Sequence, residues 1–294
     1  MKWNNFMSQI PNFYIPFPRY ENAVFIGDTA IETLSSMKIY AKGLIGSDIP
    51  NMHTYHPYEK HLECTACVLN DRRILTKALE KQSIDYVLLE DNGRSELNPV
   101  VLKTGLQEIG IKTLVLDVTG SPQEILQRAG ELFGEQARAR RAIKLFDEKY
   151  RLINDRLCTP IRKALILLSV RHPFTDELYH FALSAQSELS QFIVPLNVKN
   201  VLTDDRPSSP MQGVIDFDEI SSQTLTNLNP DFIALCGDAS GGMLALNQRI
   251  HREGFYCQAI RNMNIFSLPY YCDAMKCQQP WIMQKWIECL DPKN

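Results

Sequence analysis

A continuous helical pattern runs through Gln136-Ala-Arg-Ala-Arg-Arg-Ala-Ile-Lys-Leu-Phe-Asp-Glu-Lys-Tyr-Arg-Leu-Ile-Asn-Asp-Arg-Leu157. Its apolar residues recur every three or four positions, the spacing of one helix face: Ala139, Ala142, Ile143, Phe146, Tyr150, Ile153 and Leu157. A helix of this length extends about 33 Å, enough to join two lobes. We therefore expect an interlobe helix at residues 136–160, between an N-terminal α/β lobe (1–135) and a C-terminal α/β lobe (161–294).

Both flanking halves alternate short strand patterns with helical ones. On the N-terminal side, the strands Ala23-Val-Phe-Ile26 and Tyr86-Val-Leu-Leu89 are separated by helical spacing over residues 71–82. On the C-terminal side, Lys163-Ala-Leu-Ile-Leu-Leu168 is an almost wholly apolar strand, and residues 174–192 have helical spacing. This alternation is typical of βαβ units, so each lobe is predicted to have a parallel central sheet.

Composition excludes several classes of protein. The 294 residues carry 31 Lys+Arg and 34 Asp+Glu, a net charge of -3, which does not favour nucleic-acid binding. No run of about 18 apolar residues predicts a membrane span. The first ten residues lack the apolar core of a secretion signal, and the eight unevenly spaced cysteines are typical of reduced thiols in a cytosolic chain.

Four segments carry a resemblance to a known family. They are Lys81-Gln-Ser-Ile-Asp-Tyr-Val-Leu-Leu89, residues 106–117 followed by Ser121-Pro-Gln-Glu124, residues 196–201, and Leu225-Thr-Asn-Leu-Asn-Pro-Asp-Phe-Ile-Ala-Leu235. In this order they resemble the helical-backbone, class III solute-binding proteins that serve ABC importers. The similarity covers roughly residues 22–290.

The resemblance implies two lobes with a cleft between them and no catalysis. The cleft would bind an iron complex, haem, a corrinoid or a metal ion for delivery to an ABC importer permease. Members of this family are periplasmic or attached to the cell surface, whereas a chain complete as written would be cytoplasmic. The alternatives are a cytosolic metal- or cluster-binding redox protein with a nitrogenase-component or chelatase-like fold, and a relative that binds another protein.

The stretch between residues 51 and 67 brings potential metal ligands together. It contains His53, His56, His61, Cys64 and Cys67. Imidazole and thiolate are ligands that zinc, iron and haem accept, and the family resemblance implies that this loop faces the cleft. The alternative is that the histidines are exposed loop residues and that the two thiols alternate inward on a short strand.

Three more cysteines are expected at the same cleft. Cys236 ends an apolar strand before Gly237-Asp-Ala-Ser-Gly-Gly242, which we interpret as a flexible loop because it lacks the G-x-S-x-G spacing of a nucleophile. Cys272 and Cys277 follow the last predicted strand. Ligands bind at the carboxyl ends of strands in open α/β sheets, so a metal could bridge these thiols and the first lobe's ligands. Buried structural thiols are the alternative.

Aromatic and basic residues form a second hypothesis, an intact organic ligand. Aromatic side chains bind planar macrocycles well. Arg171 and His172 follow a predicted strand of the second lobe, where the resemblance implies contact with anionic ligand groups. The full set of expected ligand-binding residues is Tyr55, Tyr58, Arg171, His172, Tyr271 and Trp281.

The resemblance also implies where a permease would bind. Family members present one glutamate on each lobe to arginines of the permease. Glu32 in Ala30-Ile-Glu-Thr-Leu34 matches the position in the first lobe, and Glu188 in Gln186-Ser-Glu-Leu189 is its nearest counterpart in the second. The alternative is that both are ordinary solvated helix residues.

Overall fold

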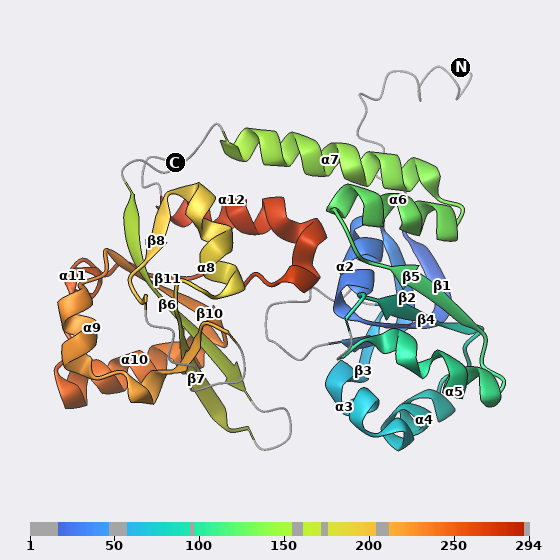
Figure 1. Cartoon of the computed structure of the whole chain (residues 1–294), viewed down its shortest axis with the longest axis horizontal. Coiled ribbons are helices and arrows are strands. Elements are labelled where there is room, and N and C mark those ends of the chain that lie inside the picture. The colour runs from blue at the N-terminus through green and yellow to red at the C-terminus, as the bar shows by residue number, and fades with distance from the viewer. Residues whose placement is uncertain are drawn as a thin grey trace, which may run out of the picture.

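The computed structural model describes residues 17–46, 58–94, 97–154, 161–171, 176–203 and 212–290. Two α/β lobes lie side by side beneath the long helix α7 (Gln136–Asn154), which runs from one to the other (Figure 1). The predicted fold class, two α/β lobes joined by one long helix, is therefore confirmed. No helix in the described ranges combines the length and the apolar character that crossing a bilayer requires.

The first lobe has a five-stranded, wholly parallel sheet in the order β3-β2-β1-β4-β5. Buried strands at its centre read as continuous apolar runs because helices cover both faces. Its strands are β1 (Arg19–Ile26), β2 (Ile39–Gly46), β3 (Lys60–Cys64), β4 (Tyr86–Asp91) and β5 (Thr113–Asp117).

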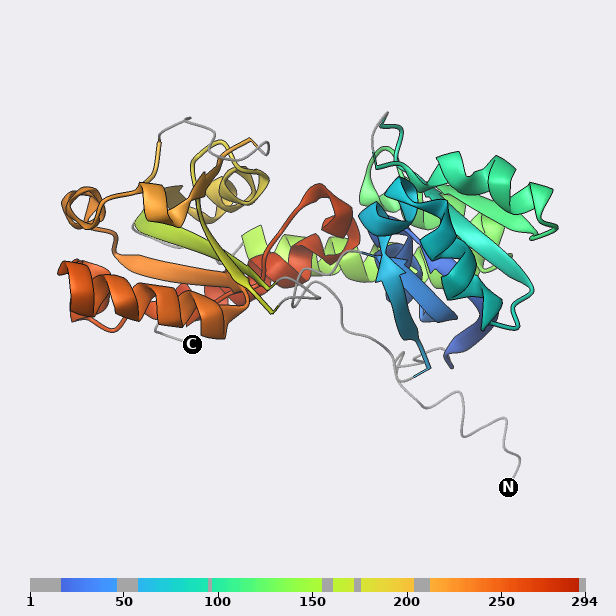
Figure 2. The same ribbon diagram turned by 90° about the horizontal axis from the view of Figure 1, so that it is seen from below.

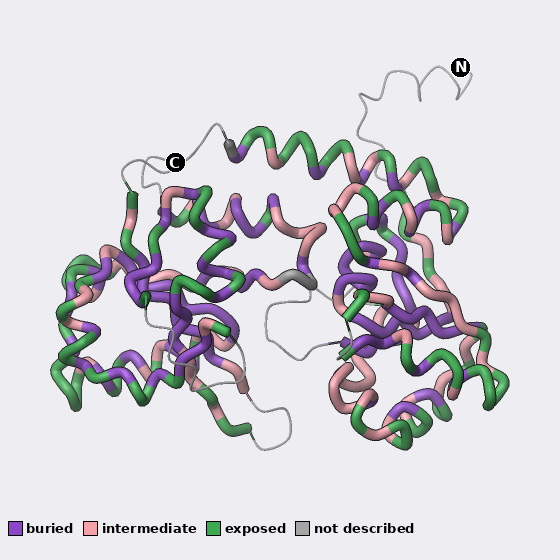
Figure 3. The backbone as a smooth tube through the Cα atoms, viewed as in Figure 1, coloured by how far each residue is buried: buried purple, intermediate pink, exposed green. Residues whose placement is uncertain are grey.

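Helices cover both faces of this sheet, and each face has its own apolar core. Phe25, Leu34 and Leu126 belong to the core beneath α2, α6 and α7, whereas Val24 and Leu75 belong to the core beneath the other helices. The helices are α2 (Asp28–Ser36), α3 (Thr65–Asn70), α4 (Arg72–Glu80), α5 (Lys103–Glu108) and α6 (Pro122–Leu132), with the 3-10 helix η1 (Pro99–Leu102). Figure 3 shows the buried residues gathered along the sheets.

The second lobe departs from the predicted parallel sheet. Its strand order is β11-β10-β6-β7-β9, with β8 beside β6, and β7 runs antiparallel to both of its neighbours. The sheet is therefore mixed, with parallel pairing confined to β6 and its partners β8 and β10, and to β10 and β11. The strands are β6 (Arg162–Arg171), β7 (Leu178–Leu183), β8 (Val198–Asn200), β9 (Val214–Asp216), β10 (Phe232–Gly237) and β11 (Ile265–Ser267).

The predicted helix over residues 174–192 is wrong. Its C-terminal part forms the short helix α8 (Glu188–Ile193), but β7 occupies the middle. Leu178, Phe181 and Ala182 fit helical spacing as well as strand spacing, so local pattern cannot decide between them. Pairing with β6 makes this segment a strand, because each of these three residues lies opposite a β6 residue in the antiparallel ladder.

Helices again cover both faces of the second sheet. Leu168, Phe192 and Trp286 belong to the core on the side of α8 and α12, and Leu167 and Leu246 belong to the core on the other side. The helical elements are α9 (Ser222–Leu228), α10 (Ala239–Glu253), α11 (Gln258–Arg261) and α12 (Gln279–Leu290), with the 3-10 helices η2 (Val194–Leu196), η3 (Phe217–Glu219) and η4 (Asp273–Gln278).

A second connection joins the lobes besides α7. The C-terminal segment η4 packs against α2 of the first lobe, and the thiol of Cys277 lies 3.5 Å from the hydroxyl of Thr33. The amide of Gln278 donates a hydrogen bond to the carboxylate of Glu32. Figures 1 and 2 both show η4 and α12 reaching from the second lobe to the first.

Candidate functional site

Strand ends of the two sheets lie on the sides of the lobes that are turned toward each other (Figures 1 and 2). Both views place β3 and α3 on the side of the first lobe turned toward the second (Figures 1 and 2). They also place the end of β6 and the start of β7 on the side of the second lobe turned toward the first. Carboxyl ends of parallel strands are where open α/β sheets bind ligands, so both sides of a candidate interlobe site are present.

Arg171 and Asp238 form the charged centre of the second lobe's side. Arg171 ends β6, and its Nε donates to Oδ2 of Asp238 at 2.9 Å while its Nη1 donates to Oδ1 of Asp176 at 2.7 Å. Asp238 in turn caps α10 by accepting from the backbone N–H of Gly241 at 2.9 Å. That hydrogen bond, together with Arg171, holds the pKa of Asp238 below its usual range. The guanidinium is thus fixed in place at the strand end.

A serine and a histidine lie beside this ion pair. Ser169 of β6 and His180 of β7 are directly opposite in the ladder, with Oγ and Nδ1 2.9 Å apart. Burial lowers the pKa of His180, and Asp218, Asp238 and Asp216 oppose that effect. Sequence reasoning missed both residues, because a helix over residues 174–192 would not have brought them together.

Gly237-Asp-Ala-Ser-Gly-Gly242 is not a flexible loop. It ends β10 and begins α10. Gly237 has a φ of 73° and lies so close to the backbone of Ser169 that a Cβ would overlap its carbonyl oxygen. A Cβ on Gly242 would lie 3.0 Å from the hydroxyl of Ser169. The glycines therefore let the start of α10 approach β6, which brings Asp238 to Arg171.

Cys64 and Cys67 are the two predicted metal ligands that the structure brings together. Their sulfurs are 2.9 Å apart, and the N–H of Cys67 donates to the sulfur of Cys64 at 3.2 Å. The alternative of a strand with inward-facing thiols is wrong, because Cys64 ends β3 and caps α3, and Cys67 lies in the first turn of that helix. Nε2 of His61 lies 3.4 Å from the carbonyl oxygen of Gly46.

The remaining cysteines do not join this pair. Cys236 is buried in the second lobe's core, and burial raises its pKa. Burial also raises the pKa of Cys277 to about 11 at its contact with α2, and Cys272 packs against the second lobe's core. Within the ranges that the structure describes, no three His, Cys, Asp or Glu side chains are grouped to hold a metal. His53 and His56 lie outside those ranges.

The predicted aromatic and basic ligand residues are also dispersed. Tyr271 stacks on Phe192 inside the second lobe, with ring centroids 4.0 Å apart. Tyr58 precedes β3 and packs on Tyr20 at the amino end of the first sheet, away from the strand ends that carry ligands. Trp281, in the first turn of α12, is 39% exposed. Tyr55 and His172 lie outside the described ranges, so of this set Arg171 alone is placed at a carboxyl strand end in the described structure.

The expectation that Glu32 is an exposed docking residue is wrong. Its side chain is 3% exposed, because η4 covers this face of α2 and Gln278 donates to its carboxylate. Sequence alone could not show this, since η4 lies some 240 residues further along the chain. Glu188, by contrast, is exposed at the start of α8, and its docking role remains a prediction.

Glu90 is a buried carboxyl group that sequence reasoning missed. It lies near the carboxyl end of β4, 5% exposed, and accepts from the backbone N–H of Ala30 in the first turn of α2 at 2.9 Å. Burial raises its pKa to about 7, while the hydrogen bond from Ala30 opposes that shift. The signal in the sequence is the pair of acids, Glu90 and Asp91, that follows the apolar run Tyr86-Val-Leu-Leu89.

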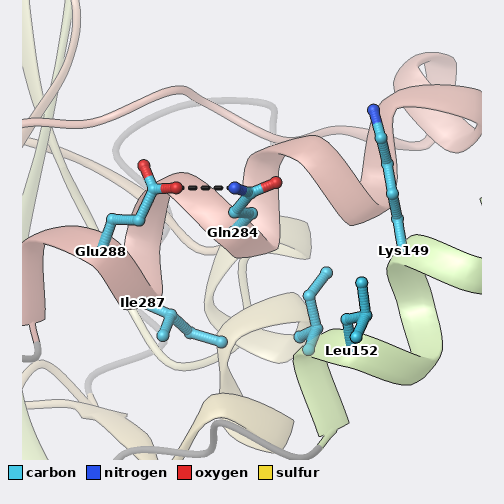
Figure 4. A pocket seen from close by; sticks show the side chains of 6 residues that line it. Lys149, Leu152, Gln284, Ile287 and Glu288 are labelled. Atoms are coloured by element: carbon cyan, nitrogen blue, oxygen red, sulfur yellow. Dashed lines mark hydrogen bonds between the residues drawn. The ribbon is translucent and has the colours of Figure 1, made fainter. Parts of the chain in front are cut away.

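A cavity of about 150 Å³ lies between the interlobe helix and α12 (Figure 4). Apolar groups of Leu152, Ile153 and Ile287 line it together with Lys149, and the amide of Gln284 donates to Glu288 at 2.6 Å along one wall. This cavity lies between two helices and not at strand ends. It therefore does not coincide with the candidate interlobe site.

No protein-family model matches the sequence, and no curated protein matches it either. Solved structures do match over nearly the whole chain. The periplasmic haem-binding protein of Roseiflexus sp. RS-1 is 12% identical with a TM-score of 0.63, covering 92% of this chain and 98% of that one. The siderophore periplasmic binding protein from the fuscachelin gene cluster of Thermobifida fusca is 14% identical with a TM-score of 0.61, covering 93% and 97%.

A third match is an ABC transporter substrate-binding protein from Listeria monocytogenes EGD-e. It is 15% identical with a TM-score of 0.54, covering 93% of this chain and 100% of that chain. At these identities the likeness concerns the fold. The chain has the two-lobed fold of periplasmic binding proteins of ABC importers.

Proposed function

We propose that this chain is a non-catalytic solute-binding protein that holds an iron chelate, haem or a corrinoid between its lobes and delivers it to an ABC importer. The observation that carries the proposal is the placement of strand ends from two α/β sheets on facing sides of lobes joined by one long helix. This fold is shared with proteins named for binding haem and siderophores. The proposal extends the roles of those proteins to this chain.

At the second lobe's strand end, Arg171 presents a guanidinium that an anionic ligand group can contact, beside the two carboxylates that already pair with it. The Arg171 side chain is 38% exposed, so part of its guanidinium is available to a ligand although Asp176 and Asp238 hold it in place. Planar guanidinium groups bind carboxylates and other oxyanions through paired hydrogen bonds. Haem propionates and the carboxylate or catecholate groups of ferric siderophores supply such oxyanions.

Replacing Arg171 with alanine is expected to weaken binding of an anionic iron complex by about tenfold or more, the usual value of a hydrogen bond to a charged group. We would titrate the protein with haemin and with a ferric tricatecholate complex by isothermal calorimetry. Arg73→Ala is the matched control, because Arg73 is an exposed arginine on α4 that pairs with Asp71 at 2.8 Å. Thermal unfolding of both variants checks that the fold is retained.

Two outcomes would contradict the proposal. One is that neither complex binds the wild-type protein, and the other is that Arg171→Ala and Arg73→Ala bind equally well. The competing redox hypothesis makes a different prediction. Protein purified without oxygen would be brown with acid-labile sulfide if it held an iron–sulfur cluster, whereas an empty solute-binding protein is colourless.

We also expect only a small rotation of the lobes when a ligand binds. Both α7 and the contact between η4 and α2 join the lobes, so opening would require breaking the buried contact of Gln278 with Glu32. Small-angle scattering with and without haemin should therefore give nearly equal radii of gyration. A large compaction would show that the second connection does not hold the lobes.

A further inference from the structure

The sequence Cys64-Thr-Ala-Cys67 bends where β3 meets α3, and the bend brings two thiols together. Cys64 is the capping residue before the helix and Cys67 is in its first turn. Side chains on a helix point toward its N-terminus, so a residue three positions after the cap points back toward the cap side chain. The same geometry joins serine and glutamate in a capping box, as at Ser121 and Glu124 of α6. Here it joins two sulfurs.

The distance between the sulfurs is 2.9 Å. A disulfide bond is about 2.05 Å long, so the two sulfur atoms need to approach by less than about 1 Å to bond. Both cysteines are half-buried, which leaves them open to a small oxidant. The pair lies at the junction of β3 and α3, two elements on the side of the first lobe that is turned toward the second (Figures 1 and 2).

We propose that Cys64 and Cys67 are a reversible thiol–disulfide site, oxidised by low-molecular-weight disulfides and reduced by thiols. Its closure covalently ties the first turn of α3 to the end of β3, at the rim of the space between the lobes. This proposal does not rest on the proposed function, since it concerns the thiol pair whatever the lobes bind.

We assign the attack to Cys64, which ends β3 and whose sulfur accepts a hydrogen bond from the N–H of Cys67 at 3.2 Å. The Cys64 thiolate attacks one sulfur of glutathione disulfide and releases one glutathione thiolate, which takes up a proton. Cys67 then loses its proton to solvent and attacks the Cys64 sulfur, releasing the second glutathione. Two protein thiols and one glutathione disulfide become one protein disulfide and two glutathione thiols, a transfer of two electrons.

Other cysteines in the described ranges lack this combination of solvent access and a second thiol beside them. Burial raises the pKa of Cys236, Cys257 and Cys277, and Cys236 and Cys257 are also shielded from solvent. Cys289 is exposed on α12 but stands alone. An exposed single thiol can form only a mixed disulfide with glutathione, whereas the Cys64–Cys67 pair loses both thiols and keeps no glutathione.

The test uses the full chain, reduced and then freed of reductant without oxygen. After incubation with glutathione disulfide, remaining thiols are alkylated in denaturant, and intact mass and peptide mapping identify each site. We expect a linked Cys64–Cys67 peptide that dithiothreitol reopens. Cys67→Ser should instead trap glutathione on Cys64, while the matched Cys272→Ser/Cys277→Ser double variant should form the same linked peptide as the wild type.

Three results would overturn the proposal. The first is that both residues remain alkylated under conditions in which Cys289 becomes glutathionylated. The second is that Cys67→Ser does not trap glutathione on Cys64. The third is a soft metal ion bound at one per chain, released by Cys64→Ser/Cys67→Ser and protecting both thiols from oxidation, which would make the pair a metal site.

Discussion

Replacing Trp286 with alanine should lower the free energy of unfolding by about 3–5 kcal/mol, the usual cost of deleting a large aromatic side chain from a core. Trp286 on α12 has no exposed surface and packs edge-on against Phe232 of the central strand β10. Its indole N–H donates to the carbonyl oxygen of Pro269 at 3.0 Å. Alanine would leave a cavity and an unmatched acceptor. Urea unfolding followed by circular dichroism measures the change.

Two further variants separate the loss of apolar volume from the loss of the indole hydrogen bond. Trp286→Phe keeps most of the apolar volume and removes the indole N–H, so we expect a loss of about 1–2 kcal/mol. Trp281→Ala is the matched control, since it removes the same side chain from the same helix at a position that is 39% exposed. Equal losses for Trp286→Ala and Trp281→Ala would show that α12 is not anchored through Trp286.

Replacing Glu90 with glutamine should remove a pH dependence of stability worth about 3 kcal/mol. In the folded chain, burial raises the pKa of Glu90 to about 7 from its ordinary value of 4.5. Between these two values the unfolded chain has released the proton and the folded chain still holds it, so the wild type loses stability as pH rises. The contribution is complete below about pH 4.5 and lost by about pH 7. A difference of that size between the pKa of the folded and unfolded chain corresponds to about 3 kcal/mol.

Glutamine is the appropriate substitution because it has the shape of the protonated acid and can still accept from the N–H of Ala30. We expect Glu90→Gln to match the wild type at pH 4.5 and to be more stable at pH 8. Urea unfolding at a series of pH values gives the slope for each protein. Glu131→Gln, at an exposed position on α6, is the control. If the free energy of unfolding of Glu90→Gln still falls with pH as steeply as that of the wild type, other groups cause the pH dependence.

Much of the first lobe could be predicted from local pattern. The expected strand over residues 86–89 lies within β4, and Ser121 and Glu124, in one of the segments that carry the family resemblance, form a capping box at α6. Such features depend on residues a few positions apart, which a sequence displays directly. The interlobe helix belongs to the same class, since its apolar stripe recurs along one continuous segment.

The second lobe could be predicted less well, because its key pairings join distant residues. Local spacing favours a helix where β7 lies, and only the ladder with β6 places His180 opposite Ser169. Arg171, the last residue of β6, pairs with Asp238, which lies 67 residues further along the chain at the start of α10. The position of Arg171 at the candidate site therefore depends on contacts that no window of sequence contains.

The sequence by itself determined the two α/β lobes, the long helix between them, and which residue types could bind a ligand. Tertiary structure decided which of those residues meet. It covered Glu32 with η4, placed Tyr271 on Phe192 inside a core, and brought the sulfurs of Cys64 and Cys67 within 2.9 Å. The physical reason is that secondary structure follows from the periodicity of neighbouring side chains, whereas burial and side-chain contact depend on packing between elements distant in the chain.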